Sequence, residues 1–180
     1  FPDTLVVWHP EGEPADPEGL PQFEELVVYT PSESNPNQLL EIDVQLDSRT
    51  VPSPGDMTAW LHELKAIKTS SDNRRVVLSD LVRVGTVSDG NLAEQRAAVR
   101  FVHRLRPSAQ QWTEYRDGAR HWDDLPWAQG IHGSETGLRQ SWIRSEIQLM
   151  PGEQAMADDP GGQQAIPFFG SSALYYELPR

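Results

Sequence analysis

The densest group of chemically useful side chains lies in residues 121–137, HWDDLPWAQGIHGSETG. This stretch combines indole rings, carboxylates, imidazoles and a hydroxyl among glycines and a proline. Exposed aromatic rings beside carboxylates can stack on a sugar and accept hydrogen bonds from its hydroxyls, or can anchor a protein partner. The sequence therefore predicts a ligand-binding loop that contains Trp122, Asp123, Asp124, Trp127 and His132. The alternative interpretation is that both indoles fold back and cover one end of the fold.

A small hydrolase is the alternative function for the same stretch, with His121 or His132 acting together with Asp123, Asp124 or Ser134. Serine catalysis needs a nucleophile that is held by a base and faces an oxyanion hole. The letters GIHGSETG lack the glycine two residues before the serine that marks a nucleophile elbow. We therefore predict no catalytic residue and favour a binding function.

Metal and cofactor chemistry finds little support in the sequence. The chain has no cysteine, which excludes disulfides, thiolate metal sites and a thiol nucleophile. His121 and His132 lie near aspartates, but their spacing matches neither H-x-x-x-H nor a calcium-binding loop. The glycines form neither G-x-G-x-x-G nor G-x-x-x-x-G-K. We predict no metal site and no cofactor.

A second candidate surface is cationic. Three arginines fall on one face of the strand predicted for AVRFVHRLRP, namely Arg100, Arg104 and Arg106. Guanidinium groups on one strand face repel one another unless acids oppose them. We expect the acidic strand that contains Glu41, Asp43 and Asp47 to pair with them across a sheet. The alternative is a site for an anionic ligand.

The charge of the chain limits its partners. The formal charge is −12 over 180 residues, and Arg49 is the only base in the first sixty. Nucleic-acid backbones are bound by clustered lysines and arginines, so we predict no nucleic-acid partner. No apolar run reaches the roughly 18–20 residues of a membrane span, and we predict no membrane insertion.

Alternating hydrophobicity predicts a chain made mainly of strands. In LLEIDVQLD, residues Leu40, Ile42, Val44 and Leu46 share one face while acids and a glutamine share the other. Similar strands are predicted at TLVVW, ELVVYT, RRVVLSDLVRVG, AVRFVHRLRP, SWIRSEIQLMP and ALYYELP. One helix is predicted over about residues 56–66, capped by Asp56. NLAEQRAA, from Leu92, allows a second helix as an alternative to a strand.

Short antiparallel strands separated by glycine and proline, with one helix, are typical of a β-sandwich, jelly roll or barrel. We therefore predict a mainly β, sandwich-like or jelly-roll-like fold in a single domain over residues 1–180. Because the sequence begins at Phe1, we expect this domain to be excised from a longer chain. Two long polar segments, HPEGEPADPEGLPQ and PGEQAMADDPGGQQ, are predicted to be projecting loops.

The carboxyl-terminal third resembles a known class of protein. The strand SWIRSEIQLMP, the polar loop after it and the closing QAIPFFGSSALYYELPR resemble, in pattern, the last strands of the protruding or spike domains of viral capsid proteins. The resemblance involves no specific motif and transfers no functional residue. It implies a domain on the virion surface, dimer or trimer contacts through strand faces, and attachment to a glycan or protein receptor through tip loops.

Overall fold

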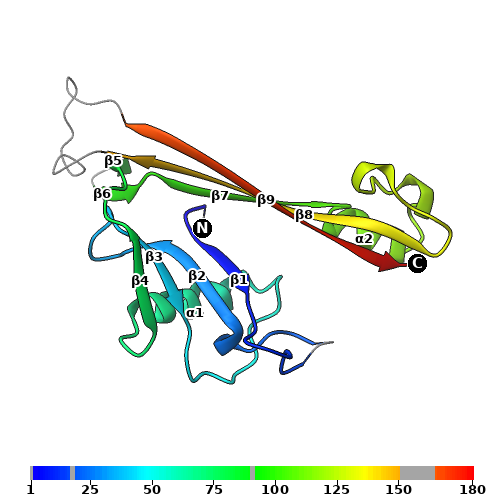
Figure 1. The fold of residues 1–180 in the computed structure, drawn as a ribbon, viewed down its shortest axis with the longest axis horizontal. Helices are drawn as coiled ribbons and strands as arrows, with labels where there is room; N and C mark the ends of the chain where they lie inside the picture. Colours follow the sequence, from blue (N-terminus) through cyan, green and yellow to red (C-terminus); the bar gives the residue numbers. More distant parts are fainter. Residues whose placement is uncertain (1, 17–18, 90–91, 151–164) are drawn as a thin grey trace. The chain divides into compact units, whose positions relative to one another are not determined.

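The computed structural model describes residues 2–16, 19–89, 92–150 and 165–180. It is mainly β, with antiparallel sheets and two α-helices (Figure 1), which confirms the predicted fold class. The polar segment PGEQAMADDPGGQQ, predicted to be a projecting loop, lies wholly outside the described residues.

The chain divides into two compact units. Unit 1 contains Phe1–Arg100 and Ile147–Phe168, and unit 2 contains Phe101–Glu146 and Phe169–Arg180. The sequence predicts one domain because no linker composition marks these boundaries. Each boundary lies inside a strand, since the strands concerned are β7 (Val99–Arg106), β8 (Thr136–Leu149) and β9 (Ile166–Pro179). A strand carries no linker signature.

Unit 1 contains a four-stranded antiparallel sheet in the order β1-β2-β3-β4. Its strands are β1 (Leu5–Trp8), β2 (Leu26–Pro31), β3 (Leu39–Asp43) and β4 (Arg74–Ser79). Helix α1 (Met57–Thr69) contributes Leu64 and Ile67 to the buried cluster that contains Val28 and Ile42 of the sheet. Burying side chains of this kind stabilises a fold by about 1.5–3 kcal/mol each. This is the predicted helix on a sheet.

The start of helix α1 follows from its cap. The Asp56 carboxylate accepts a hydrogen bond from the backbone N–H of Ala59 at 3.0 Å, which confirms the predicted cap. Strand β3 is shorter than predicted. Leu46 has a φ of 57°, and its side chain is 96 % exposed instead of lying on the buried face. A left-handed residue turns the chain away from the sheet, so the alternation ends there.

The alternative of a helix from Leu92 is wrong. Residues Leu92–Ala97 form strand β6, which pairs with β5 (Val84–Asp89) from Val84 opposite Ala97 to Asp89 opposite Leu92. Two residues connect the strands, the usual length of a tight hairpin connection, and they lie outside the described residues. Cross-strand pairing here outweighs the helix propensity of the sequence.

Unit 2 is built on the three-stranded sheet β7-β8-β9 and on the segment between β7 and β8. That segment contains helix α2 (Ala109–Arg116) and the 3₁₀ turns Trp122–Asp124 and Ala128–Gly130. Figure 1 shows α2 beside the carboxyl end of β9.

Helix α2 was not predicted from the sequence, and it begins with a capping box. The Ser108 hydroxyl accepts from the Gln111 N–H, and the Gln111 side chain accepts from the Ser108 N–H.

Candidate functional site

The two indoles of the predicted binding loop are buried. Trp122 and Trp127 are 2 % and 3 % exposed, and their ring centroids lie 4.6 Å apart. Trp112 packs edge-on against both rings, and Tyr115 packs against Trp122. This arrangement corrects the prediction of exposed stacking rings and agrees with the alternative in which the indoles cover one end of the fold.

Hydrogen bonds fix the orientation of the two indoles. The Trp122 Nε1–H donates to the Gly133 carbonyl at 2.8 Å, and the Trp127 Nε1–H donates to the Trp122 carbonyl at 3.2 Å. Leu125 is buried with them, and Leu178 of β9 packs against the cluster. The pair therefore forms the core of unit 2, because a buried indole whose N–H is satisfied is a structural element.

The polar residues of the same stretch lie at the surface. Asp123, Asp124, His121 and Ser134 are exposed. The His132 Nε2 lies 3.6 Å from the Asp123 Oδ1, and the His132 Nδ1 lies 3.3 Å from the Gly130 carbonyl. Asp123 is 83 % exposed, so solvent screens this contact strongly. Of the predicted polar candidates, the structure brings His132 and Asp123 together, while the two indoles meet in the buried cluster.

No serine–histidine–carboxylate triad forms among the residues that the structure describes. Ser134 makes no hydrogen bond to a histidine there. A serine–histidine contact does exist elsewhere: the His103 Nε2 lies 2.9 Å from the Ser141 Oγ, and these residues come from neighbouring strands. No carboxylate in the described ranges holds the other nitrogen of His103. Orientation of the base by a third group is part of this chemistry, and the contact lacks it.

The predicted pairing of the three arginines with the acidic strand does not occur. Strand β3, which carries Glu41 and Asp43, is hydrogen-bonded to β2 and β4, whereas Arg100, Arg104 and Arg106 belong to β7 in another sheet. Asp47 binds Arg49 at 2.8 Å instead. The prediction failed because strand order is not encoded in the charge pattern of single strands.

One face of the β7-β8-β9 sheet gathers cationic and aromatic side chains. The Arg104 guanidinium lies 5.8 Å from the centroid of the Trp142 ring, which places both on one face. The Gln140 amide donates to the Tyr175 hydroxyl at 2.8 Å, so Tyr175 of β9 lies on that face too. By strand alternation it also holds the cations Arg100, Arg106 and Arg144, the ring of Phe169, and two carboxylates, Glu146 and Glu177. We call this surface the arginine face.

A concave surface of the opposite charge lies in unit 1. Five glutamates and Asp43 line a pocket of about 580 Å³, together with the cation Arg74. We call it the acidic face and define it by Glu11, Glu13, Glu24, Glu41 and Asp43. Burial, followed by a hydrogen bond to Glu41 and the negative charge of that residue, raises the pKa of the neighbouring Tyr29. The acidic face has a negative potential because its carboxylates outnumber Arg74, the arginine in its lining.

Glu25 also lines this pocket but has a structural role. Its carboxylate accepts hydrogen bonds from the backbone N–H groups of Gln22 and Ala15, each at 2.8 Å. These bonds, first that of Gln22 and then that of Ala15, hold the pKa of Glu25 below its ordinary value. Glu25 stays ionised in the folded protein and ties the loop after β1 to the start of β2.

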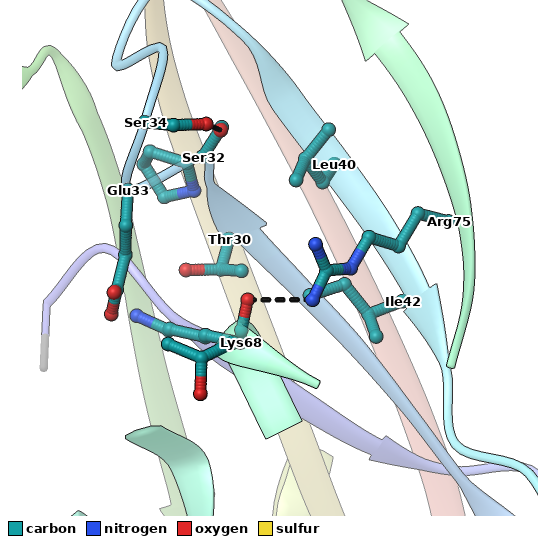
Figure 2. A pocket seen from close by; sticks show the side chains of 10 residues that line it. Thr30, Ser32, Glu33, Ser34, Leu40, Ile42, Lys68 and Arg75 are labelled. Carbon is teal, nitrogen blue, oxygen red and sulfur yellow. Dashed lines mark hydrogen bonds between the residues drawn. The ribbon is translucent and has the colours of Figure 1, made fainter. Parts of the chain in front are cut away.

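The sequence analysis also missed a pocket of about 260 Å³ at the end of β2 and α1. Figure 2 shows Lys68 and Arg75 lining it beside the hydroxyl groups of Thr30, Ser32 and Ser34. The Arg75 guanidinium donates to the backbone carbonyls of Lys68, at 2.7 Å, and Ser70. The Lys68 amino group donates to the Thr4 hydroxyl at 2.9 Å. Both cations thus hold the end of α1 against the sheet.

Within the described residues, no group of three or more histidines, aspartates and glutamates is arranged to hold a metal ion. The helices described for this chain are all too short or too polar to cross a membrane.

Compared with known proteins, the chain matches no family model, no curated protein and no solved structure.

Proposed function

We propose that the chain is a non-catalytic recognition or assembly module that self-associates through the β7-β8-β9 sheet. The observation that carries the proposal is the exposure of large apolar side chains along β9. Phe169 is 66 % exposed and Leu174 is 69 % exposed, and Ile166, Phe168 and Tyr175 are also exposed. By strand alternation Phe169 and Tyr175 lie on one face of β9 and Ile166, Phe168 and Leu174 lie on the other. Both faces of the strand therefore expose large apolar side chains, and exposed apolar area beyond single residues marks an interaction surface.

The position of β9 supports the same proposal. It is an edge strand of 14 residues, with β8 on one side only in the order β7-β8-β9. A long apolar edge strand is a surface on which another chain can pair or pack, and soluble proteins usually protect it. A second copy of the chain is a partner that is always present at the same concentration, and most soluble oligomers are built from identical chains.

Sedimentation velocity over a range of protein concentrations tests the proposal. Phe169→Gln and Leu174→Gln each remove an apolar side chain from β9, and Leu61→Gln is the matched control on the exposed surface of α1. Burying such a side chain contributes about 1.5–3 kcal/mol, so at least one β9 variant is expected to associate about tenfold or more weakly. The control should associate as the wild-type chain does. A wild-type monomer at every concentration would contradict the proposal.

Receptor binding is the second part of the proposed function. It is supported by the resemblance to protruding domains of viral capsids, which implies attachment to a glycan or protein through loops. With the indoles buried, the exposed Asp123, Asp124 and His132 are the groups that would accept or donate hydrogen bonds to sugar hydroxyls. The mechanism is hydrogen bonding without aromatic stacking, which predicts weak, multivalent attachment.

A glycan-array screen of the wild-type chain and of the double variant Asp123→Asn, Asp124→Asn tests this part. Asp117→Asn, which changes another exposed aspartate of unit 2, is the control. Specific binding that the double variant loses and the control keeps supports receptor attachment. Absence of binding by the wild-type chain removes the glycan from the proposal.

A further inference from the structure

The charge of the chain is divided unequally between its two units. In unit 2 the arginines and the carboxylates are equal in number, so the whole formal charge of −12 falls on unit 1. The four arginines of the arginine face are most of the cationic side chains of the β7-β8-β9 sheet. The chain therefore has one strongly negative unit and a cationic sheet face, of which Arg104, Arg106 and Arg144 belong to unit 2 and Arg100 is the last residue of the first segment of unit 1.

The arginine face has an excess of positive charge, because its four arginines outnumber the two carboxylates that strand alternation places on it, Glu146 and Glu177. Arg100, Arg104 and Arg106 are exposed, and none of the three forms an ion pair within the part of the chain that the structure describes. Grouped guanidinium ions repel one another, and arginine favours planar contact with carboxylates and stacking on aromatic rings. Phe169 and Tyr175 on the same face add exposed apolar area. Such a surface is suited to packing against an acidic partner that also offers apolar atoms.

The acidic face has those properties. Glu11, Glu13 and Glu24 are exposed, and Val27 and Leu46 contribute apolar atoms to the same pocket. The cation Arg74, with its Nη1 4.0 Å from the Asp43 Oδ2, offsets only part of this charge. Glu41 and Asp43 lie on the face of their sheet opposite to Ile42, which is buried against α1. The acidic face is thus a half-exposed sheet face with excess carboxylates.

We propose that the arginine face of one copy docks on the acidic face of a second copy. This inference rests on the proposed self-association and specifies its geometry. The two surfaces are different, so the contact is heterologous, and each copy can give its arginine face to one neighbour and its acidic face to another. Opposite charges steer the encounter and fix the register, and apolar atoms of both sheets supply the buried area.

A second copy fits the arginine face better than a nucleic acid does. Arginine and aromatic side chains on a sheet also bind single strands through phosphate contacts and base stacking. Each copy has a total charge of −12, so the net charge opposes a polyanion and a second copy alike, and the local chemistry of the partner decides between them. A second copy presents its carboxylates locally on the acidic face, next to apolar atoms. Charge complementarity therefore favours self-association.

Mixing two disabled variants tests the inference. Arg104→Glu reverses a charge at the centre of the arginine face of one chain, and Glu24→Lys reverses a charge on the acidic face of another. Each variant alone is expected to associate at least about tenfold more weakly than wild type, because like charges oppose one another. The mixture retains one intact contact, between the arginine face of the Glu24→Lys chain and the acidic face of the Arg104→Glu chain. Sedimentation velocity should therefore show association in the mixture that neither variant shows alone, and a mixture that stays monomeric would contradict the inference.

The controls separate charge from other effects. Arg116→Glu makes the same change on an exposed residue of α2 and should associate as wild type does. Circular dichroism checks that each variant is folded. Added salt should weaken wild-type association, since it screens exposed charges.

Three outcomes would overturn the inference. An oligomer that ignores salt and both charge variants but weakens in Phe169→Gln or Leu174→Gln would leave the proposed function intact and refute the charged contact. A wild-type monomer at every concentration would refute both. A monomer that binds fluorescein-labelled oligothymidylate, and loses this binding in Arg104→Glu, would assign the face to a nucleic acid instead of a second copy.

Discussion

Gly137 on β8 lies directly against the buried Trp127, and replacing this glycine by alanine tests the core of unit 2. A methyl group at Gly137 would lie 2.5 Å from the Trp127 Cε2 and 2.6 Å from its Cδ2. Ordinary carbon–carbon contacts are about 3.5–4.0 Å, so the indole would have to withdraw by about 1 Å. Trp127 cannot do so freely, because Trp122 and Trp112 pack against it.

We expect Gly137→Ala to destabilise the chain by about 1–3 kcal/mol, the usual cost of overpacking a core. For a chain of this size each kcal/mol lowers the melting temperature by about 2–4 °C. Urea denaturation followed by tryptophan fluorescence measures the free energy of unfolding directly. Gly85→Ala is the matched control, since Gly85 also lies in a strand and a methyl group there would have no atom within 4 Å. We expect it to be neutral or to stabilise the chain by about 0.4–1 kcal/mol.

A double-variant cycle shows whether Trp127 causes the loss. In a Trp127→Leu background the smaller side chain leaves room for the methyl group, so the cost of Gly137→Ala should fall toward that of the Gly85 control. If Gly137→Ala costs no more than the control, or costs the same with and without the indole, the close packing of Trp127 on β8 is refuted.

Three further predictions concern stability. Trp122→Ala should cost about 3–5 kcal/mol and abolish the far-ultraviolet exciton signal of the coupled indoles; a variant that kept this signal and wild-type stability would contradict the buried cluster. Glu25→Gln should be less stable at neutral pH, because one amide oxygen cannot accept both backbone hydrogen bonds. The folded-state pKa of Glu25 is lowered, so its contribution to stability is present above the unfolded pKa of about 4.3 and disappears as the pH falls through the folded value. The urea midpoints of the wild type and of Glu25→Gln should therefore differ at neutral pH and converge in acid. A difference that persists in acid would argue against this cause. Asp56→Ala should cost about 1 kcal/mol and Asp56→Asn much less, and equal losses in chemical denaturation would show that the cap of α1 contributes nothing.

Local patterns in the sequence predicted most elements of the fold. Short β-branched runs located β1 and β2, alternation located β7, and the spacing of apolar residues with an aspartate cap located α1. Two elements failed for opposite reasons. Strand β6 has helix-forming residues and is a strand only through its pairing with β5. Helix α2 is short and polar, so its sole signal was the serine and glutamine of its capping box.

The candidate site was harder to predict because exposure is a tertiary property. The residue types around Trp122 and Trp127 are equally consistent with an exposed loop and with a buried cluster. Gly137 is the signal that could have distinguished a buried cluster from an exposed loop, because the missing side chain leaves room for the Trp127 indole against the strand. Its contact partner, however, is ten residues away in the sequence. The arginines of β7 were correctly placed on one strand face, whereas the position of their acidic counterpart depends on sheet order and cannot be read from one strand.

The edge strand β4 has a consequence for how the protein behaves in solution. Val76, Val77 and Leu78 are all exposed on it. A short β-branched segment of this kind is prone to form cross-β aggregates when it is left unprotected. Arg74 and Arg75 precede the segment and Asp80 follows it, and charged flanking residues of this type oppose stacking of identical strands. The solubility of the chain should therefore depend on these flanking charges. Neutralising Arg74 and Asp80, which leaves the hydrogen bonds of Arg75 to the end of α1 in place, should produce thioflavin-positive fibrils before any loss of native structure.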